Sequence, residues 1–225
     1  MTLATTASLA VDGFELIGGV LSVLECAELI EQLGTVGGAG RRGLLANPVV
    51  KQFADSGRIK ALVRPHLLME PQPVRAIYFD KSPEANWLVP WHQDLTVAVR
   101  QRRDVPGWGP WSVKEGVHHV QPPTELLEQM VAVRVHLDDS DADNGALRVL
   151  PVTHLSGRLN APAVSQLRTQ AHEVLCEARA GDVLLMRPLL LHSSSRSHSA
   201  RHRRVLHVEY AGFDLPPTLE WSQEA

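Results

Sequence analysis

The chain has 225 residues, with 22 Lys and Arg against 25 Asp and Glu, and a formal net charge of −3 at pH 7. Because neither sign of charge is in excess, the composition argues against general binding to nucleic acid or to anionic membranes. The length suffices for one well-buried core and no stretch has linker composition, so we expect a single domain over residues 1–225.

The N-terminal residues and the cysteines favour a cytoplasmic protein. Residues 3–11 are too short and too rich in Thr and Ser for a convincing signal peptide. No run reaches the roughly 18 apolar residues that a membrane helix needs. Cys26 and Cys176 have neither a pairing pattern nor metal-binding spacing, so we expect two small buried hydrophobic residues in a reducing compartment. The oligomeric state is left open.

The first third of the chain carries helical patterns. Ser22 and Glu25 form the capping box of a helix that runs to about Leu33, where a glycine follows. Residues 48–68 repeat apolar side chains at helical spacing and end before a proline-rich segment. These segments predict helices that act as scaffold.

From residue 74 onward the pattern changes to short β-prone segments separated by Gly, Pro, Asn and Asp turns. The segments are residues 74–80, 95–100, 130–137, 146–150, 173–178, 182–186 and 203–210. Helices followed by many short strands predict a mainly β fold of α+β type, a β-sandwich or jelly roll backed by N-terminal helices.

The strongest candidate for chemistry is the pair His92 and Asp94, together with the distant His192. Side chains two apart on a strand leave the same face, and we place this pair at the start of the strand that includes residues 95–100. Two histidines and one carboxylate occupy three positions of an octahedron and leave three open, as in non-haem iron oxygenases. The pattern therefore predicts an Fe(II) site.

A second His-x-Asp pair, His136 and Asp138, has the same spacing. It lies where a strand-like run enters an acidic turn over residues 138–143, so we prefer the first pair as the metal site. For His136 we expect a cavity-lining or hydrogen-bonded role.

Residues 203–210 alternate in polarity. One face carries Arg203, Val205, His207 and Glu209, and the other carries Arg204, Leu206, Val208 and Tyr210. The polar face suits a wet cavity, where the Arg203 guanidinium could hold a carboxylate with two hydrogen bonds. The alternative is that Arg203 belongs to the solvated basic run of residues 196–204.

The insert over residues 100–128 contains Trp108 and Trp111. It could form a lid whose rings keep water from a reactive site, or a surface loop packed by its own tryptophans, and the sequence leaves both open. Its adjacent histidines cannot face one metal together on a strand, and the two histidines of the serine- and arginine-rich segment lie in a loop context. We therefore expect no metal ligand among His118, His119, His198 and His202.

Four segments together resemble the phytanoyl-CoA dioxygenase family of Fe(II)- and 2-oxoglutarate-dependent oxygenases. They are residues 12–14, 80–94, 144–151 and 192–210. The resemblance implies a cupin-like double-stranded β-helix in which His92, Asp94 and His192 bind iron. It also implies that Arg203, eleven residues after His192, binds the far carboxylate of 2-oxoglutarate with help from Ser194.

The activity implied by the resemblance is hydroxylation of a small organic substrate with O2, while 2-oxoglutarate is converted to succinate and CO2. Relatives that halogenate lack the carboxylate ligand, so the presence of Asp94 favours hydroxylation. Two alternatives remain open. A metal-dependent hydrolase or isomerase could use the same three side chains to hold zinc but would not need Arg203. A non-catalytic ligand-binding module would bind no stoichiometric iron.

Overall fold

The structure is a computed structural model that describes residues 7–36, 38 and 40–222. Its larger sheet has the order β1-β10-β7-β12-β2, and all its pairings are antiparallel. The strands are β1 (Phe14–Ile17), β10 (Val183–Met186), β7 (Met130–His136), β12 (Arg203–Ala211) and β2 (Gln72–Lys81).

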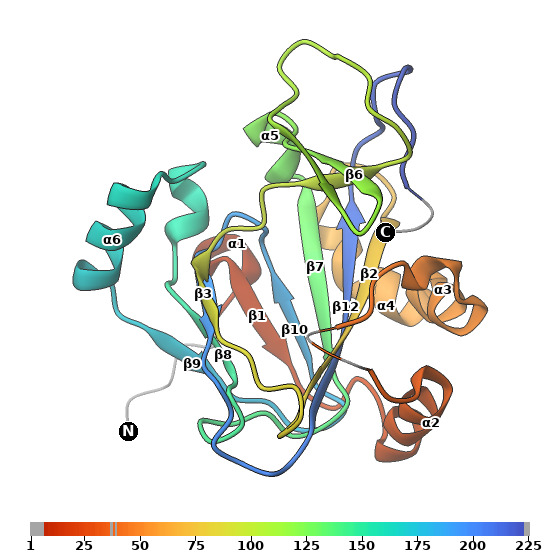
Figure 1. The fold of residues 1–225 in the computed structure, drawn as a ribbon, viewed down its shortest axis with the longest axis vertical. Helices are drawn as coiled ribbons and strands as arrows, with labels where there is room; N and C mark the ends of the chain where they lie inside the picture. The colour runs from red at the N-terminus through yellow and green to blue at the C-terminus, as the bar shows by residue number, and fades with distance from the viewer. Residues whose placement is uncertain (1–6, 37, 39, 223–225) are drawn as a thin grey trace.

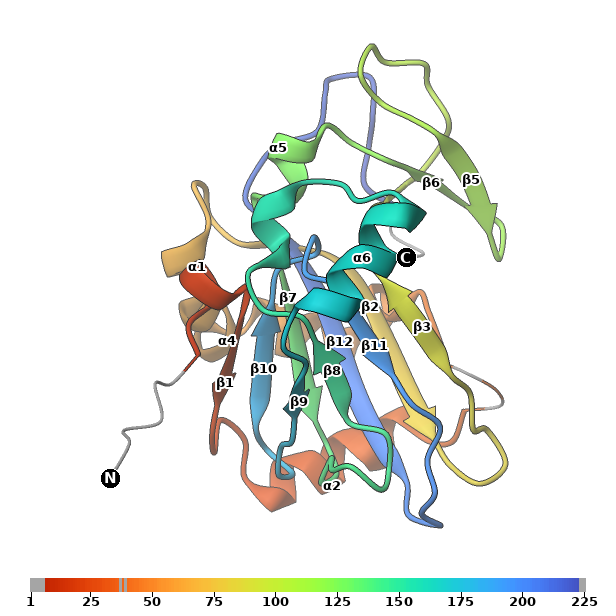
Figure 2. The same ribbon diagram turned by 90° about the vertical axis from the view of Figure 1, so that its left-hand side faces the viewer.

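A smaller sheet, β3-β11-β8-β9, lies across one face of the larger sheet (Figure 2). It consists of β3 (Val89–His92), β11 (His192–Ser194), β8 (Leu147–Val149) and β9 (Val174–Cys176). One apolar cluster joins the two sheets, with Ala132, Leu184 and Met186 of the larger sheet packed with Leu147 and Val149 of the smaller one. The arrangement confirms the expected mainly β fold, a double-stranded β-helix.

Helices cover the other face of the larger sheet (Figure 1). They are α2 (Val23–Leu33), α3 (Pro48–Asp55) and α4 (Gly57–Val63), whose apolar side chains share one core with those of β2, β7, β10 and β12. Within that core the Tyr210 hydroxyl donates to the Ala54 carbonyl oxygen at 2.8 Å. Because side chains alternate along a strand, burial of Leu206, Val208 and Tyr210 on this face leaves Arg203 and His207 on the opposite face.

The capping box at Ser22 and Glu25 is present, and the helix ends at Leu33 as expected. Each of the seven predicted strand segments overlaps an observed strand. Residues 48–68 divide into α3, α4 and the 3-10 turn η2 (Arg64–His66), because Ser56 interrupts the first helix and caps the second.

Several elements were not anticipated from the sequence. They are α1 (Leu9–Asp12), β1, β3, β11, the strands at residues 111–114 and 117–120, the 3-10 turns η1 (Leu44–Ala46) and η3 (Thr153–Ser156), α5 (Thr124–Leu127) and α6 (Ala161–Gln170).

The placement of the His-x-Asp pair in one strand with residues 95–100 was wrong. His92 is the last residue of β3, and Asp94 follows it outside the strand. β4 (Val97–Val99) belongs to a different sheet. The backbone N–H of Asp94 donates to the Pro188 carbonyl at 2.8 Å, which fixes the turn after β3.

The insert contributes β5 (Trp111–Lys114) and β6 (Val117–Val120) to a third sheet that also contains β4. This sheet stands beyond one end of the two main sheets (Figures 1 and 2). Trp108 and Trp111 pack against the apolar cluster that includes Val97 and Phe213. The tryptophans thus join the insert to the rest of the fold, and Lys114 of the same insert lines a cavity.

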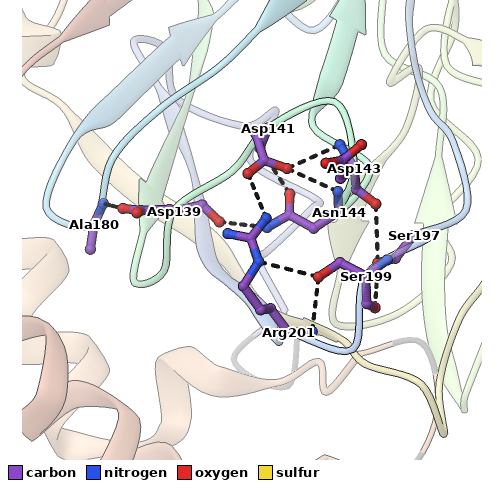
Figure 3. Close-up of polar contacts among 8 residues, drawn as sticks. All are labelled: Asp139, Asp141, Asp143, Asn144, Ala180, Ser197, Ser199 and Arg201. Atoms are coloured by element: carbon purple, nitrogen blue, oxygen red, sulfur yellow. Dashed lines mark hydrogen bonds and ion pairs between the residues drawn. The ribbon is translucent and has the colours of Figure 1, made fainter.

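The acidic turn after β7 is closed by its own hydrogen bonds (Figure 3). Asp141 Oδ1 accepts from the backbone N–H groups of Asp143 and Asn144, and its Oδ2 accepts from Arg201 at 2.6 Å. The Asn144 side chain donates to the Asp139 carbonyl at 2.7 Å. The Asp141 carboxylate therefore stabilises the turn. Within the described ranges, no helix has the length and apolarity required to cross a membrane.

Candidate metal centre and cavity

His92, Asp94 and His192 offer one ligand atom each within 4.8 Å of one another. His92 Nε2 lies 3.7 Å from Asp94 Oδ1, and His192 Nε2 lies 3.6 Å from Asp94 Oδ2. Among the residues that the structure describes, this is the one group of three or more His, Cys, Asp or Glu side chains arranged in this way. The spacing suits a single cation between the three groups.

Backbone carbonyls orient both imidazoles. His92 Nδ1 lies 2.8 Å from the Pro90 carbonyl oxygen, and His192 Nδ1 lies 2.9 Å from that of Leu190. An N–H donated from each Nδ1 leaves the Nε2 lone pair free toward Asp94. This is the tautomer that a metal-binding histidine needs.

The protonation states also suit a cation. Burial lowers the pKa of His192 to about 4, so this imidazole is neutral near pH 7. Burial alone would raise the pKa of Asp94, but His192 and His92 outweigh it and lower that pKa to about 2. A carboxylate and a neutral imidazole are the forms that bind metal.

Gln93, between the candidate ligands His92 and Asp94, forms its hydrogen bonds with backbone groups. Its Nε2 donates to the carbonyl oxygens of Gly157 and Leu189 at 2.8 and 2.6 Å, and its Oε1 accepts from the Leu159 N–H at 2.8 Å. Three hydrogen bonds thus fix the segment that carries His92 and Asp94 to two other loops. No sequence pattern had indicated this role.

The second His-x-Asp pair is not assembled as a site. Asp138 accepts two hydrogen bonds from the Arg204 guanidinium, both at 2.7 Å. His136 is fully buried, and burial, with Arg134 and Arg203 nearby, lowers its pKa to about 3. Neither ring nitrogen of His136 has a hydrogen-bond partner in the described part of the chain, and His136 is not among the residues that line the cavity. Both roles expected for His136 were therefore wrong.

Arg203 and Arg204 point to opposite faces of β12. Arg204 is paired with Asp138, whereas Arg203 is 3% exposed and lines a cavity beside the metal group. Its Nε and Nη1 atoms are buried without a hydrogen-bond partner among the described residues. Burial lowers the pKa of Arg203 to about 9, which still leaves the group cationic at pH 7. A buried cation with free donors is suited to an anion.

Ser194 lies at the same end of the cavity and is joined to Lys81. Lys81 Nζ donates to Ser194 Oγ at 2.8 Å, and Ser194 Oγ donates to the Gly145 carbonyl at 2.8 Å. Lys81 pairs with Arg203 across β2 and β12 and is fully buried. Sequence reasoning had missed Lys81, although its position at the end of a predicted strand, before Ser82 and Pro83, was a usable signal.

The cavity has a volume of about 480 Å³. Its lining includes the three metal-binding candidates, Ser194 and Arg203, and further polar and charged side chains, namely Arg42, Arg75, Gln93, Thr96, Lys114, Arg134, His207 and Glu209. The apolar lining residues are Ile77, Phe79, Trp87, Val89, Leu95 and Leu147. This volume and mixture suit a small organic molecule.

The other histidines and the cysteines lie outside the metal group. His119 is buried, with Nδ1 3.1 Å from the Val117 carbonyl oxygen, and His202 Nδ1 lies 2.7 Å from Asp80 Oδ1. Cys26 and Cys176 are both buried and free, as expected.

A double-stranded β-helix that presents two histidines and a carboxylate to a cavity has the architecture of the non-haem Fe(II) enzymes that use 2-oxoglutarate. A family model described as phytanoyl-CoA dioxygenase matches residues 11–205. The chain therefore belongs to the phytanoyl-CoA dioxygenase family. No curated protein matches the sequence.

Solved structures share the fold. EctD from S. alaskensis, with 2-oxoglutarate and 5-hydroxyectoine, superposes with a TM-score of 0.71 at 16% identity, over 94% of this chain and 78% of that one. HygX from Streptomyces hygroscopicus, with nickel and 2-oxoglutarate, gives 0.65 at 19% identity, over 90% and 84%. The α-ketoglutarate-dependent epimerase SnoN from nogalamycin biosynthesis gives 0.65 at 18% identity, over 90% and 78%.

Proposed function

We propose that the chain is a non-haem Fe(II)- and 2-oxoglutarate-dependent dioxygenase that hydroxylates a small organic substrate. The observation that carries the proposal is one cavity lined both by His92, Asp94 and His192 and by the unpartnered guanidinium of Arg203. A zinc hydrolase or isomerase would use the three metal ligands but would not need the buried cation. A non-catalytic ligand-binding module would need neither the three metal ligands nor the buried guanidinium of Arg203.

His92, Asp94 and His192 would hold the iron. The donor set fits Fe(II), because two imidazoles and one carboxylate face one point while the cavity leaves the other side open. When bound, Fe(II) would activate O2 at the expense of 2-oxoglutarate, which is oxidised and decarboxylated to succinate and CO2. The chain itself contributes the orientation of the ligands, fixed through Pro90, Leu190 and Gln93.

Arg203 and Ser194 would bind the far carboxylate of 2-oxoglutarate, and Lys81 would add positive charge beside them. The Nε and Nη1 donors of Arg203 are free to bind an anion in the cavity. Lys81 donates a hydrogen bond to Ser194 Oγ. Lys81 on β2 is also the cross-strand partner of Arg203 on β12, so the two cations are neighbours at the Arg203 end of the cavity. A dianionic co-substrate would neutralise charge that the protein otherwise carries unpaired.

The apolar lining would keep water from the reacting groups. Phe79, Val89 and Leu147 come from β2, β3 and β8, so both main sheets contribute apolar side chains to the cavity. Exclusion of water favours reaction of the bound substrate over unproductive consumption of the co-substrate.

Hydroxylation is the outcome that Asp94 favours, because the carboxylate fills the ligand position that halogenating relatives leave for a halide. The SnoN epimerase shares the fold, so the identity of the product has to be tested directly. The first test is anaerobic binding of Fe(II) and of 2-oxoglutarate, followed by succinate release with O2. Oxygen-isotope labelling of O2 then decides between hydroxylation and epimerisation, since only a hydroxylated product retains the label.

Stoichiometric iron, 2-oxoglutarate binding lost on change of Arg203, and labelled product are the expected results. A protein that binds zinc but shows no affinity for 2-oxoglutarate would instead be a hydrolase or isomerase. A protein that binds no metal would be a ligand-binding module.

A further inference from the structure

The floor of the cavity has two charged ends. Along the paired strands β2 and β12, Lys81 lies opposite Arg203 at one end and Arg75 lies opposite Glu209 at the other. Arg203 and Glu209 are six residues apart on β12, and at about 3.3 Å per residue this is roughly 20 Å. The co-substrate is a five-carbon diacid, much shorter than that distance. A molecule held at Arg203 therefore leaves the Arg75 end free.

Positive charge exceeds negative charge at the Arg75 end. Its lining residues include three cations, Arg42, Arg75 and Lys114, and one carboxylate, Glu209. Arg42 forms an ion pair with Glu115 at the tip of the β5–β6 hairpin. Glu209 already receives Arg75 Nη1 at 3.1 Å and has His207 Nε2 at 3.4 Å. The Glu209 carboxylate therefore already interacts with Arg75 and His207 in the unliganded protein.

Two cationic side chains at the Arg75 end, Arg75 and Lys114, have hydrogen-bond donors that could bind a ligand. The side chain of Arg75 is only 10% exposed, and its Nε is buried without a hydrogen-bond partner in the described ranges. Lys114 forms no ion pair or side-chain hydrogen bond with any described residue, although it lines the same cavity. A buried donor without a partner is costly unless a ligand satisfies it. The ion pair with Glu209 therefore leaves one buried donor of Arg75, its Nε, unsatisfied.

We propose that the hydroxylated substrate carries an anionic group, a carboxylate or a phosphate, which Arg75 and Lys114 bind at the end of the cavity away from Arg203. This inference rests on the proposed function and adds the substrate class. His207 lies on the floor between the two ends, next to Glu209 on the same face of β12. A substrate anchored at Arg75 would extend from there toward His92, Asp94 and His192, with its reacting C–H bond beside the metal.

Electrostatics within the cavity agree with this arrangement. Burial lowers the pKa of Lys114, and the charge of Arg75 lowers it further, while Asp94 and Glu209 act in the opposite direction. Arg75 also helps to lower the pKa of Asp94. These groups therefore act on one another across the cavity, and an added anion between Arg75 and Lys114 would relieve their repulsion.

The test uses the full chain loaded with Zn(II), as a diamagnetic substitute for Fe(II), and saturated with 2-oxoglutarate. Saturation closes the Arg203 end to other anions. Binding of butyrate, of its neutral analogue butyramide and of inorganic phosphate is then followed by ligand-observed NMR. We expect saturable binding of butyrate or phosphate and none of butyramide. The tighter of the two anions indicates whether the substrate bears a carboxylate or a phosphate.

Variants locate the binding. Lys114→Gln removes an exposed cation without breaking an ion pair, and Arg75→Gln combined with Glu209→Gln keeps a neutral, hydrogen-bonded pair. Each should weaken anion binding about tenfold, the typical worth of a charge-assisted hydrogen bond. Lys51→Gln is the matched control, because Lys51 is an exposed lysine of α3 outside the cavity. Unchanged 2-oxoglutarate affinity in all variants shows that the fold is intact.

Three results would overturn the inference: no binding of either anion, binding only in the absence of 2-oxoglutarate, or anion binding by Lys114→Gln and by the double variant that is as tight as binding by the wild-type protein. All three leave the proposed function standing if 2-oxoglutarate binds to the wild-type protein. Failure of 2-oxoglutarate itself to bind would instead reject the proposed function, and the substrate class with it.

Discussion

His192 on β11 lies directly opposite His92 on β3, and the centroids of the two rings are 4.2 Å apart. Residues opposite each other on antiparallel strands point to the same face of the sheet. The register of this short strand pair therefore brings both imidazoles to the same side. A slip of one residue would move one of them to the other face and dismantle the candidate site.

Replacement of His92 or His192 by Ala should abolish stoichiometric Fe(II) binding and turnover, because each change leaves two of three protein ligands. His136→Ala should retain iron, although the loss of a fully buried side chain should lower the free energy of unfolding by about 2 kcal/mol or more. Anaerobic metal titration and urea denaturation measure the two effects. Loss of iron in His136→Ala with retention in His92→Ala would show that the wrong pair has been chosen.

Arg203→Lys should reduce 2-oxoglutarate affinity about tenfold or more, because lysine keeps the charge but loses the fork that binds two oxygens. Arg204→Lys is the matched control on the opposite face. It should leave that affinity within about twofold and cost on the order of 1 kcal/mol of stability through the weakened pair with Asp138. Calorimetric titration of both variants with 2-oxoglutarate measures the two affinities. A larger loss of affinity in Arg204→Lys than in Arg203→Lys would contradict the proposed role of Arg203.

Affinity for 2-oxoglutarate should depend on pH through Lys81. Burial, together with Arg203 and Arg134, lowers the pKa of Lys81 to about 7. The ammonium form binds a carboxylate and the amine form does not, so wild-type affinity should fall as the pH rises above about 7. Lys81→Met should bind more weakly at pH 6 and lack this fall. Parallel pH profiles for the two proteins would mean that the charge of Lys81 does not affect binding of the co-substrate.

The same lysine affects stability with a defined sign. Its folded pKa of about 7 lies below the ordinary value of 10.5. Between these two values the unfolded chain binds more protons than the folded chain, so the contribution of Lys81 to the free energy of unfolding increases with pH across that window. Lys81→Met should remove this increase. Urea denaturation at several pH values above and below 7 provides the measurement, with metal and co-substrate absent.

Asp94→Gly should severely reduce iron binding and hydroxylation, because two imidazoles alone would remain as protein ligands. It need not produce a halogenase, since halide transfer also depends on where the substrate lies relative to the metal. Iron content and succinate formation, each with and without chloride, are the measurements. Near-normal hydroxylation by Asp94→Gly without added ligands would show that Asp94 does not bind the metal.

Local patterns were enough to predict much of the fold and part of the candidate site. The capping box at Ser22 and Glu25 depends on contacts three residues apart, and it is present as expected. The alternation over residues 203–210 placed Arg203 and Arg204 on opposite faces of one strand, as observed. Both signals are short-range, because helical and strand periodicities are properties of neighbouring residues.

Long-range pairing decided the rest. The His-x-Asp spacing occurs twice in the sequence, and what separates the two copies is that Asp138 is paired with Arg204 whereas Asp94 faces His192. Lys81 reaches the candidate site because β2 pairs with β12, and Lys114 reaches the cavity through a separate hairpin. Strand register and packing between sheets depend on residues far apart in the chain, which periodicity in a single sequence does not specify. The sequence thus determined which residue types face inward, and the tertiary structure decided which of them meet.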